Sequence, residues 1–174
     1  MPKMKLSSEE YQRVLNFFQN AAQEEPTNWS YWCDIGFCHG KLGHWQESVS
    51  AFEKILDKAE ATATVLNMLG HAHIKLENYP EAKLILDRAH SMAPNNLSVL
   101  YKLAVIHFHR GEFEQALSPL QQILLLKPKH LKAQFSLGLI YHRLNDPKAT
   151  DRQIAIVRDL NQQFGEQLAQ IVRG

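Results

Sequence analysis

The sequence repeats itself with a period of 34 residues. When the chain is written in rows of that length, one column holds small residues and another holds large apolar ones. The small column contains Gly36, Gly70, Ala104 and Gly138. The large column contains Phe52, Leu86, Leu120 and Ile154. Because repeated units bury their apolar surface mainly against neighbouring units, this period predicts a stack of similar supersecondary units.

Each unit holds two amphipathic stretches of about 13 residues, with apolar residues spaced three and four apart. A short break containing Gly, Asn or Pro separates the two stretches, so each unit is predicted to be a helix, a turn and a helix. A Gly or Asn in the turn, Asn78 in the second unit, is expected to adopt the left-handed conformation that ends the first helix. In the fourth unit, Asp146 and Pro147 predict an N-cap followed by proline at the first helical position.

The pattern Leu66, Leu69-Gly70, Tyr79, Ala82, Leu86, Ala89 and Pro94 resembles the tetratricopeptide repeat. The resemblance covers about residues 29 to 164 in four tandem copies. It implies an all-α fold, a right-handed α-solenoid of helix-turn-helix repeats. The expected organisation is an N-terminal capping helix (1–27), four repeats (28–62, 63–96, 97–130 and 131–164) and the end of a C-terminal capping helix (165–174).

Both ends of such a stack need a cap, because a terminal unit lacks one neighbour. Upstream, Ser7 to Glu10 reads as a capping box that begins an amphipathic helix. Downstream, an apolar stripe at helical spacing is expected to cover the last repeat, and Gly165 leaves open whether the chain forms one long helix or two there. The stripe consists of Phe164, Leu168, Ile171 and Val172.

Composition narrows the classes of function. Nineteen basic and eighteen acidic side chains give a net charge of +1, too little to favour binding to a nucleic-acid backbone. The polar start has no apolar core of a signal peptide, and no run approaches the ~18 apolar residues that would span a membrane. A cytoplasmic protein without membrane insertion is therefore expected. No nucleophile elbow, zincin motif or dinucleotide fingerprint occurs, so the chain is predicted to be no enzyme and to use no cofactor.

The repeat phase also predicts a binding face. In the first helix of each repeat, the side chains at one set of positions point away from the face that packs on the second helix. The resemblance implies that they line a concave groove, with Phe37, Tyr101, Phe108 and Phe135 as apolar anchors and the basic side chains as attraction for acidic partners. The predicted groove residues are Cys33, Phe37, Lys41, Asn67, His71, Ile74, Lys75, Tyr101, Lys102, Val105, Phe108, His109, Lys132, Phe135, Leu139 and Arg143. The alternative is that these side chains pack on neighbouring helices or under the chain's own C-terminal helix.

Histidines and cysteines suggest a metal site only superficially. His39, His73 and His107 share a column, but equivalent places on packed helices lie about 10 Å apart, whereas metal ligands lie within ~2 Å of one ion. They are predicted to be packing residues, and Cys33 is predicted to be a small buried thiol. Cys33 and Cys38 are five apart on one helix, a spacing that suits neither a metal site nor a disulfide. A version of this family that grips C-terminal carboxylates has Lys and Asn where this chain has Cys33 and Phe37, so that clamp is predicted to be absent.

Together these features predict a non-catalytic adaptor that binds a protein partner, through a peptide or helix with apolar anchors and acidic flanks. Two alternatives remain open. A small protein of a few such repeats with an extra N-terminal helix looks like the bacterial chaperones of type III secretion translocators. The groove or the caps can also mediate self-assembly into a homo-oligomeric scaffold.

Overall fold

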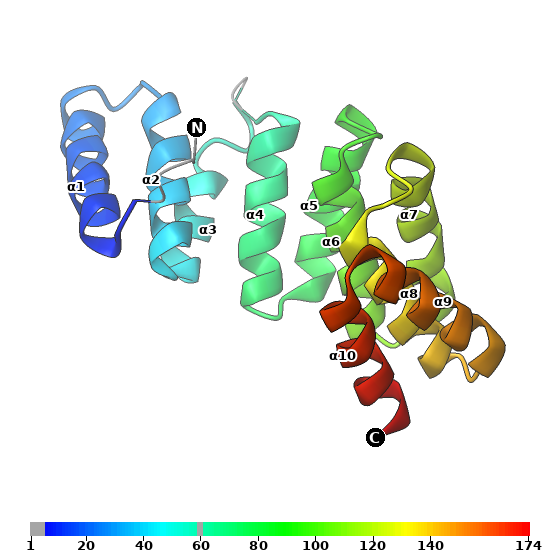
Figure 1. Ribbon diagram of the computed structural model, residues 1–174. Coiled ribbons are helices and arrows are strands. Elements are labelled where there is room, and N and C mark those ends of the chain that lie inside the picture. Colours follow the sequence, from blue (N-terminus) through cyan, green and yellow to red (C-terminus); the bar gives the residue numbers. More distant parts are fainter. Residues whose placement is uncertain (1–5, 59–60) are drawn as a thin grey trace. The chain divides into compact units, whose positions relative to one another are not determined.

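The computed structural model describes residues 6–58 and 61–174, and these residues form helices and turns with no strand (Figure 1). The first five residues of the predicted cap at 1–27 lie outside that range. The helices are α1 (Ser8–Glu24), α2 (Ser30–Leu42), α3 (Trp45–Glu53), α4 (Ala63–Lys75), α5 (Tyr79–Met92), α6 (Leu97–His109), α7 (Phe113–Leu126), α8 (Leu131–Arg143), α9 (Pro147–Leu160) and α10 (Gln162–Arg173). The chain divides into two compact units, Met1–Met92 and Ala93–Gly174.

Within each unit, every helix packs mainly on the helices next to it in sequence, in the order α1 to α5 and α6 to α10. This is the nearest-neighbour packing expected of helical repeats, and the predicted all-α repeat fold is confirmed. The helix α1 begins with the predicted capping box. The Ser7 amide donates to Glu10 Oε2 at 2.6 Å, and the Glu10 amide donates to Ser7 Oγ at 3.2 Å.

Small residues bring paired helices of the first unit close together. A Cβ added to Gly36 of α2 would lie 2.8 Å from Phe52 Cε1, and one added to Gly70 of α4 would lie 2.5 Å from Leu86 Cγ. These distances are too short for an unshifted side chain. The predicted columns of small and large residues therefore meet in space, and the absence of a side chain lets the second helix of each pair seat its apolar residue.

The helix α3 is shorter than the period predicts. It ends at Glu53 after nine residues, and the chain continues through hydrogen bonds between residues three apart, such as Ile55 N–H to Phe52 C=O at 3.1 Å. These tighter turns leave Ile55 fully buried. By contrast, α1, α5 and α7 each end two residues before a proline, which disfavours helical backbone in the residue that precedes it.

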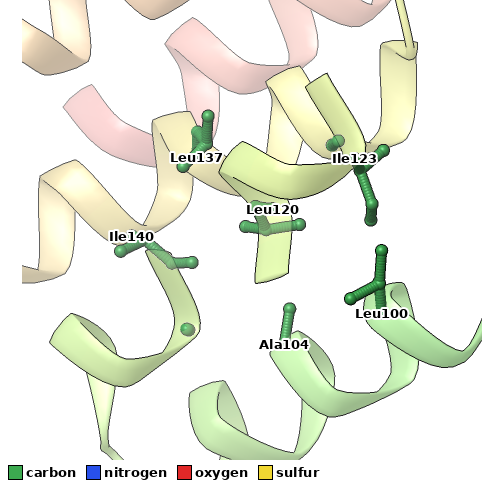
Figure 2. Close-up of a cluster of buried hydrophobic side chains, with 8 residues drawn as sticks. Leu100, Ala104, Leu120, Ile123, Leu137 and Ile140 are labelled. Carbon is green, nitrogen blue, oxygen red and sulfur yellow. The ribbon is translucent and has the colours of Figure 1, made fainter. Parts of the chain in front are cut away.

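The core of the second unit joins three helices. Figure 2 shows Leu100 and Ala104 of α6 facing Leu120 and Ile123 of α7, with Ile140 of α8 in the same cluster. Each of these side chains is at most 3% exposed. Full burial of a leucine or isoleucine side chain contributes about 1.5–3 kcal/mol, so this cluster fixes the spacing between α6 and α8.

The second unit ends in two helices and not one, which settles the alternative left open at Gly165. Asn161 ends α9 in an extended conformation and caps α10, accepting the Phe164 amide on Oδ1 at 3.1 Å. The predicted boundary at residue 165 lies inside α10. A Cβ on Gly165 would lie 2.5 Å from Arg158 Cα, so this glycine lets α10 pack directly on the backbone of α9.

The glycine of the fourth repeat has a different neighbour from the one its column suggests. A Cβ on Gly138 of α8 would lie 2.5 Å from Leu168 Cδ2 of α10, whereas the column predicts contact with α9. Leu168 is fully buried with Ile154 and Val157 of α9. The C-terminal helix thus occupies the space over Gly138.

The four helix-turn-helix turns share one backbone path. In each, an amide donates to the carbonyl five residues earlier, for example Glu112 to His107 at 2.9 Å. The left-handed residues are Gly43, Glu77, Gly111 and Asn145, with φ of 83°, 58°, 73° and 55°. The expectation of Asn78 at this place in the second turn is wrong, because Glu77 adopts the conformation. The expected N-cap of α9 is confirmed, since Asp146 Oδ1 accepts the Ala149 amide at 2.9 Å.

Candidate peptide-binding site

The second unit contains a small cavity between α6 and α8. Its volume is about 150 Å³. The residues that line it are Tyr101, Ala104, Val105, Phe108, His109, Leu120, Ser136, Leu139 and Ile140. An apolar cavity of about 150 Å³ is large enough for one benzene-sized group, so this one has room for a single large apolar side chain.

The hydrophobic core forms the floor of the cavity. Ala104, Leu120 and Ile140 belong to the buried cluster of Figure 2, so their positions are set by packing that is independent of any ligand. Partly buried side chains form the walls. Phe108 packs edge-to-face on Phe113 of α7, with ring centroids 5.5 Å apart. This contact holds the Phe108 ring in place on its α7 side.

Tyr101 supplies the polar part of the wall. Its hydroxyl lies 3.3 Å from Ser136 Oγ of α8, and its ring lies 6.4 Å from the ring of His130. The Tyr101–Ser136 contact joins the two helices that flank the cavity. A hydroxyl pair at the edge of an apolar pocket can also exchange its hydrogen bond with a peptide group of a ligand.

The helices that flank the cavity carry cations and no carboxylates. Neither α6 nor α8 contains Asp or Glu, whereas Lys132 and Arg143 are exposed on α8. Burial lowers the pKa of Lys102 on α6 to about 8, and its Nζ donates to Ser98 Oγ at 2.7 Å. With that pKa, Lys102 is still mostly protonated at pH 7. The electrostatic surroundings therefore favour an anionic partner.

Five predicted groove residues line this cavity, namely Tyr101, Val105, Phe108, His109 and Leu139. Phe135 does not line it, because its ring packs edge-to-face on Phe164 of α10 at 6.1 Å. Lys102, Lys132 and Arg143 lie on the flanking helices but outside the lining. Ser136 lines the cavity and was missed, since it follows a groove column by one residue and carries no apolar signal.

In the first unit, the predicted groove residues contact other parts of that unit. Phe37 is 39% exposed; its ring centroid lies 6.2 Å from that of Tyr11 on α1, and Lys41 Nζ lies 5.0 Å from it. Half-buried Cys33 packs against the core that contains Val49 and Phe52.

Trp45 of α3 contacts two predicted groove residues of α4. The His71 ring stands edge-on to Trp45 at 5.5 Å, and Lys75 Nζ lies 6.0 Å from the same ring. Asn67 and Ile74, which lie on α4 with His71 and Lys75, are half-buried. These residues line neither the cavity formed by α1, α2 and α3 nor the cavity between α3 and the turn that joins α4 to α5.

The histidines that share a column lie in different surroundings. His39 and His73 each have a buried Nδ1 without a hydrogen-bond partner among the described residues, whereas His107 Nδ1 lies 2.6 Å from Glu112 Oε2. In residues 6–58 and 61–174, no group of three His, Cys, Asp or Glu is placed to hold a metal ion. Over the same residues, no helix combines the length and the apolar character needed to cross a membrane.

Burial of His73 predicts a loss of stability in mild acid. Burial lowers the pKa of His73 below its ordinary value of 6.5, and the carboxylates of Glu53 and Glu81 oppose this shift. The unfolded chain therefore takes up a proton at higher pH than the folded chain. The stabilising contribution is complete above about pH 6.5 and is lost as the pH falls through the folded-state pKa.

We expect His73→Phe to reduce the fall in Tm between neutral pH and pH 5, measured by circular dichroism, because the buried imidazole no longer has to be charged. The same change at the exposed His142 is the control. If the two variants lose equal pH dependence, burial of His73 is not the cause.

Comparisons with known families cover most of the repeat region. A profile described as "Tetratricopeptide repeat" matches residues 39–96. A second profile, described as "Anaphase-promoting complex, cyclosome, subunit 3", matches residues 75–149. A search of curated protein sequences gave no match.

Several solved structures have a similar fold. YrrB, described as a TPR protein with an unusual peptide-binding site, aligns with a TM-score of 0.82 at 20% identity over 93% of this chain and 84% of its own. MamA from Desulfovibrio magneticus aligns with a TM-score of 0.83 at 21% identity, over 88% and 87% of the two chains. A thermophilic TPR protein in Thermus thermophilus aligns with a TM-score of 0.70 at 16% identity, over 93% and 90%. At these identities the likeness concerns the fold alone.

Proposed function

Because the chain belongs to the tetratricopeptide repeat family, we propose that it is a non-catalytic adaptor whose Ala93–Gly174 unit binds a peptide or helix of a partner protein. One large apolar side chain of the ligand enters the cavity between α6 and α8, and acidic residues flank that side chain. The observation that carries the proposal is the cavity itself, which has an apolar floor and a volume of about 150 Å³.

The size of the cavity limits the anchor. A leucine, isoleucine, methionine or phenylalanine side chain fits a space that holds a benzene-sized group, and its transfer from water is worth about 1.5–3 kcal/mol. Several such contacts, or one contact with favourable flanking charges, give the weak to moderate affinity typical of transient adaptors. The description of YrrB as a peptide-binding TPR protein supports this class of ligand and assigns no residue here.

The charge of the flanking helices supports acidic residues beside the anchor. Lys132 and Arg143 are exposed on α8, and neither α6 nor α8 offers a carboxylate to repel an acidic ligand. Such exposed cations accelerate association and select partners more than they add affinity. The steering effect weakens with salt, because charges are screened beyond about 10 Å at 0.1 M.

A tryptophan at Val105 should close the cavity and abolish anchoring. We expect peptides selected by phage display on the wild-type protein to share one apolar residue with Asp or Glu nearby. Val105→Trp should weaken their binding by at least about tenfold in calorimetry, because the anchor loses its pocket. Leu125→Trp is the matched control, since Leu125 lies on α7 at 84% exposure and outside the cavity.

Charge reversal at Arg143 tests the flanks separately. Arg143→Glu should slow association and reduce its dependence on salt while leaving an uncharged version of the peptide unaffected. Equal binding by wild type and Val105→Trp would contradict the anchor, and salt-independent association would contradict the acidic flanks.

Self-assembly is the competing function that the surface itself suggests. Leu84 and Leu125 are 71% and 84% exposed, on the second helices of two repeats. Light scattering over a range of protein concentrations distinguishes the two functions. A mass that rises with concentration, and falls again in a Leu84→Glu/Leu125→Glu variant, would favour the scaffold.

A further inference from the structure

A second cavity, lined by carboxylates, lies in the first unit between α3 and the turn that joins α4 to α5. Its volume is about 620 Å³. The polar residues that line it are Gln46, Glu53, His73, Glu77, Asn78 and Glu81, and we call it the acidic cleft. It is formed by a different unit from the apolar cavity, so nothing in the proposed function above uses it.

Three carboxylates of the acidic cleft lack an ion-pair partner among the described residues. Glu53, Glu77 and Glu81 are exposed, and none of them forms an ion pair with another residue in the part of the chain that the structure describes. No Lys or Arg lines the cleft. A cation that enters the cleft is therefore attracted by each of these carboxylates.

His73 supplies an independent indication that a ligand belongs here. Its side chain is 8% exposed and lines the cleft, and its Nδ1 has no hydrogen-bond partner among the described residues. Buried polar atoms of native proteins are nearly always paired, and an unpaired one calls for a physical explanation. Since burial lowers the pKa of His73, the ring is neutral at pH 7 and does not compete with an incoming cation for the carboxylates.

The backbone conformation of Glu77 is a further indication that the carboxylate at this position serves a purpose other than stability. Glu77 has a φ of 58°, a left-handed conformation in which the other three turns place Gly43, Gly111 or Asn145. A residue with a long side chain is disfavoured there relative to glycine. The chain therefore keeps a carboxylate in the lining of the cleft at a cost in stability.

From this arrangement we infer that the acidic cleft binds an arginine side chain of a partner polypeptide, as a second docking site separate from the apolar cavity. The guanidinium group donates in its plane to two carboxylates at once, and the side-chain carbonyls of Gln46 and Asn78 can accept its remaining hydrogens. A bare metal ion fits less well, because no three His, Cys, Asp or Glu among the described residues lie close enough to coordinate one. Arginine suits the site better than lysine because its planar fork matches carboxylates set apart on different helices.

The test uses the full chain labelled with ¹⁵N and the capped tripeptide Ac-Gly-Arg-Gly-NH₂ as the probe. We expect a saturable shift of the backbone amides of Glu53, Glu77, Asn78 and Glu81 in a heteronuclear NMR titration. The same peptide with citrulline, which has the shape of arginine without its charge, should produce no saturable shift. The lysine peptide should bind about tenfold more weakly, because it forms no bidentate pair.

Variants locate the effect. Glu53→Gln/Glu81→Gln should abolish the arginine-dependent shifts, whereas Glu24→Gln, which removes an exposed carboxylate of the same unit outside the cleft, should leave them unchanged. Val105→Trp should also leave them unchanged, so failure of the apolar site and failure of this one are told apart. Absence of saturable shifts, equal shifts with citrulline, or shifts produced by Mg²⁺ or Ca²⁺ and not by arginine would each overturn the proposal.

Glu77→Gly separates function from stability at a single residue. Because glycine adopts a φ of 58° without strain, we expect Tm to rise by about 2–4 °C. Arginine binding should weaken in the same protein. A variant that is more stable and binds arginine as well as the wild type would show that Glu77 has no part in the site.

Discussion

Leu168→Ala is expected to lower the free energy of unfolding by about 2–5 kcal/mol, the usual range for a fully buried leucine. Leu168 is completely buried between α8 and α9, and its Cδ2 occupies the space directly over Gly138. Truncation leaves a cavity that cannot collapse easily, because α9 and α10 already touch through Gly165 and Arg158.

Urea unfolding followed by far-ultraviolet circular dichroism measures this loss. All three tryptophans, Trp29, Trp32 and Trp45, belong to the first unit, so tryptophan fluorescence reports on that unit and circular dichroism on both. Ile171→Ala, at a half-exposed position of the same helix, is the control and should cost far less. A comparable loss in both variants would mean that α10 is held by its general hydrophobicity and not by the Gly138 contact.

A double variant tests the same contact from the other side. Gly138→Ala alone should destabilise the protein, since its Cβ would lie 2.5 Å from Leu168 Cδ2. In the Leu168→Ala background that methyl group enters the cavity, so the two costs should be less than additive. Strictly additive costs would show that the residues do not share one space.

Gly70→Leu is expected to cost about 1–3 kcal/mol, through overpacking of α4 against α5. Its Cβ would lie 2.5 Å from Leu86 Cγ, and Leu86 is fully buried and has no open space to move into. The sign of the effect is informative, because glycine to leucine at an open helical site would stabilise a helix by up to ~1 kcal/mol.

The first unit contains all the tryptophans, so thermal or urea unfolding followed by fluorescence measures the Gly70→Leu cost directly. Gly40→Ala is the control, because its Cβ would lie 3.3 Å from Ser48 Oγ, a contact far less severe than the 2.5 Å between a Cβ at Gly70 and Leu86 Cγ. An unchanged or higher Tm for Gly70→Leu would contradict the pairing of these two columns.

The 34-residue period was enough to predict the fold, because equivalent positions in successive repeats make equivalent packing contacts. Gly36 meets Phe52 and Gly70 meets Leu86, as the alignment of small and large columns requires. The same logic is wrong at Gly138, whose neighbour is Leu168 of α10. A column describes what an internal repeat packs against, whereas the last repeat packs against a helix that has no counterpart in the period.

Local backbone choices were also beyond the sequence pattern. Asn78 has the higher preference for left-handed backbone, yet Glu77 adopts it, because the hydrogen bond from the Asn78 amide to His73 C=O fixes the register of the turn. The early end of α3 is a second case, since nothing in the spacing of Phe52 and Ile55 distinguishes an α-helix from the tighter turns that follow Glu53.

The repeat pattern predicts a helix face for the candidate site, but it does not predict which residues of that face line the cavity. Tyr101, Val105 and Phe108 were predicted to share a groove face, and all three line the cavity. Phe37 and Phe135 lie on the same column face, but Tyr11 and Phe164 from the terminal helices pack on them. The acidic cleft was missed altogether, because its carboxylates come from α3, from the turn between α4 and α5, and from α5, and they are brought together only when these elements pack.

Because the four turns share one backbone path, the side chain of the left-handed residue can vary while the backbone of the turn stays the same. Each turn closes with the same amide-to-carbonyl hydrogen bond, while its left-handed residue is glycine, glutamate or asparagine. A Cβ at Gly43 or Gly111 would meet no atom within 4 Å, so a side chain there projects into open solvent. The side chain at each turn can therefore be varied on its own, with a modest backbone penalty for each residue other than glycine.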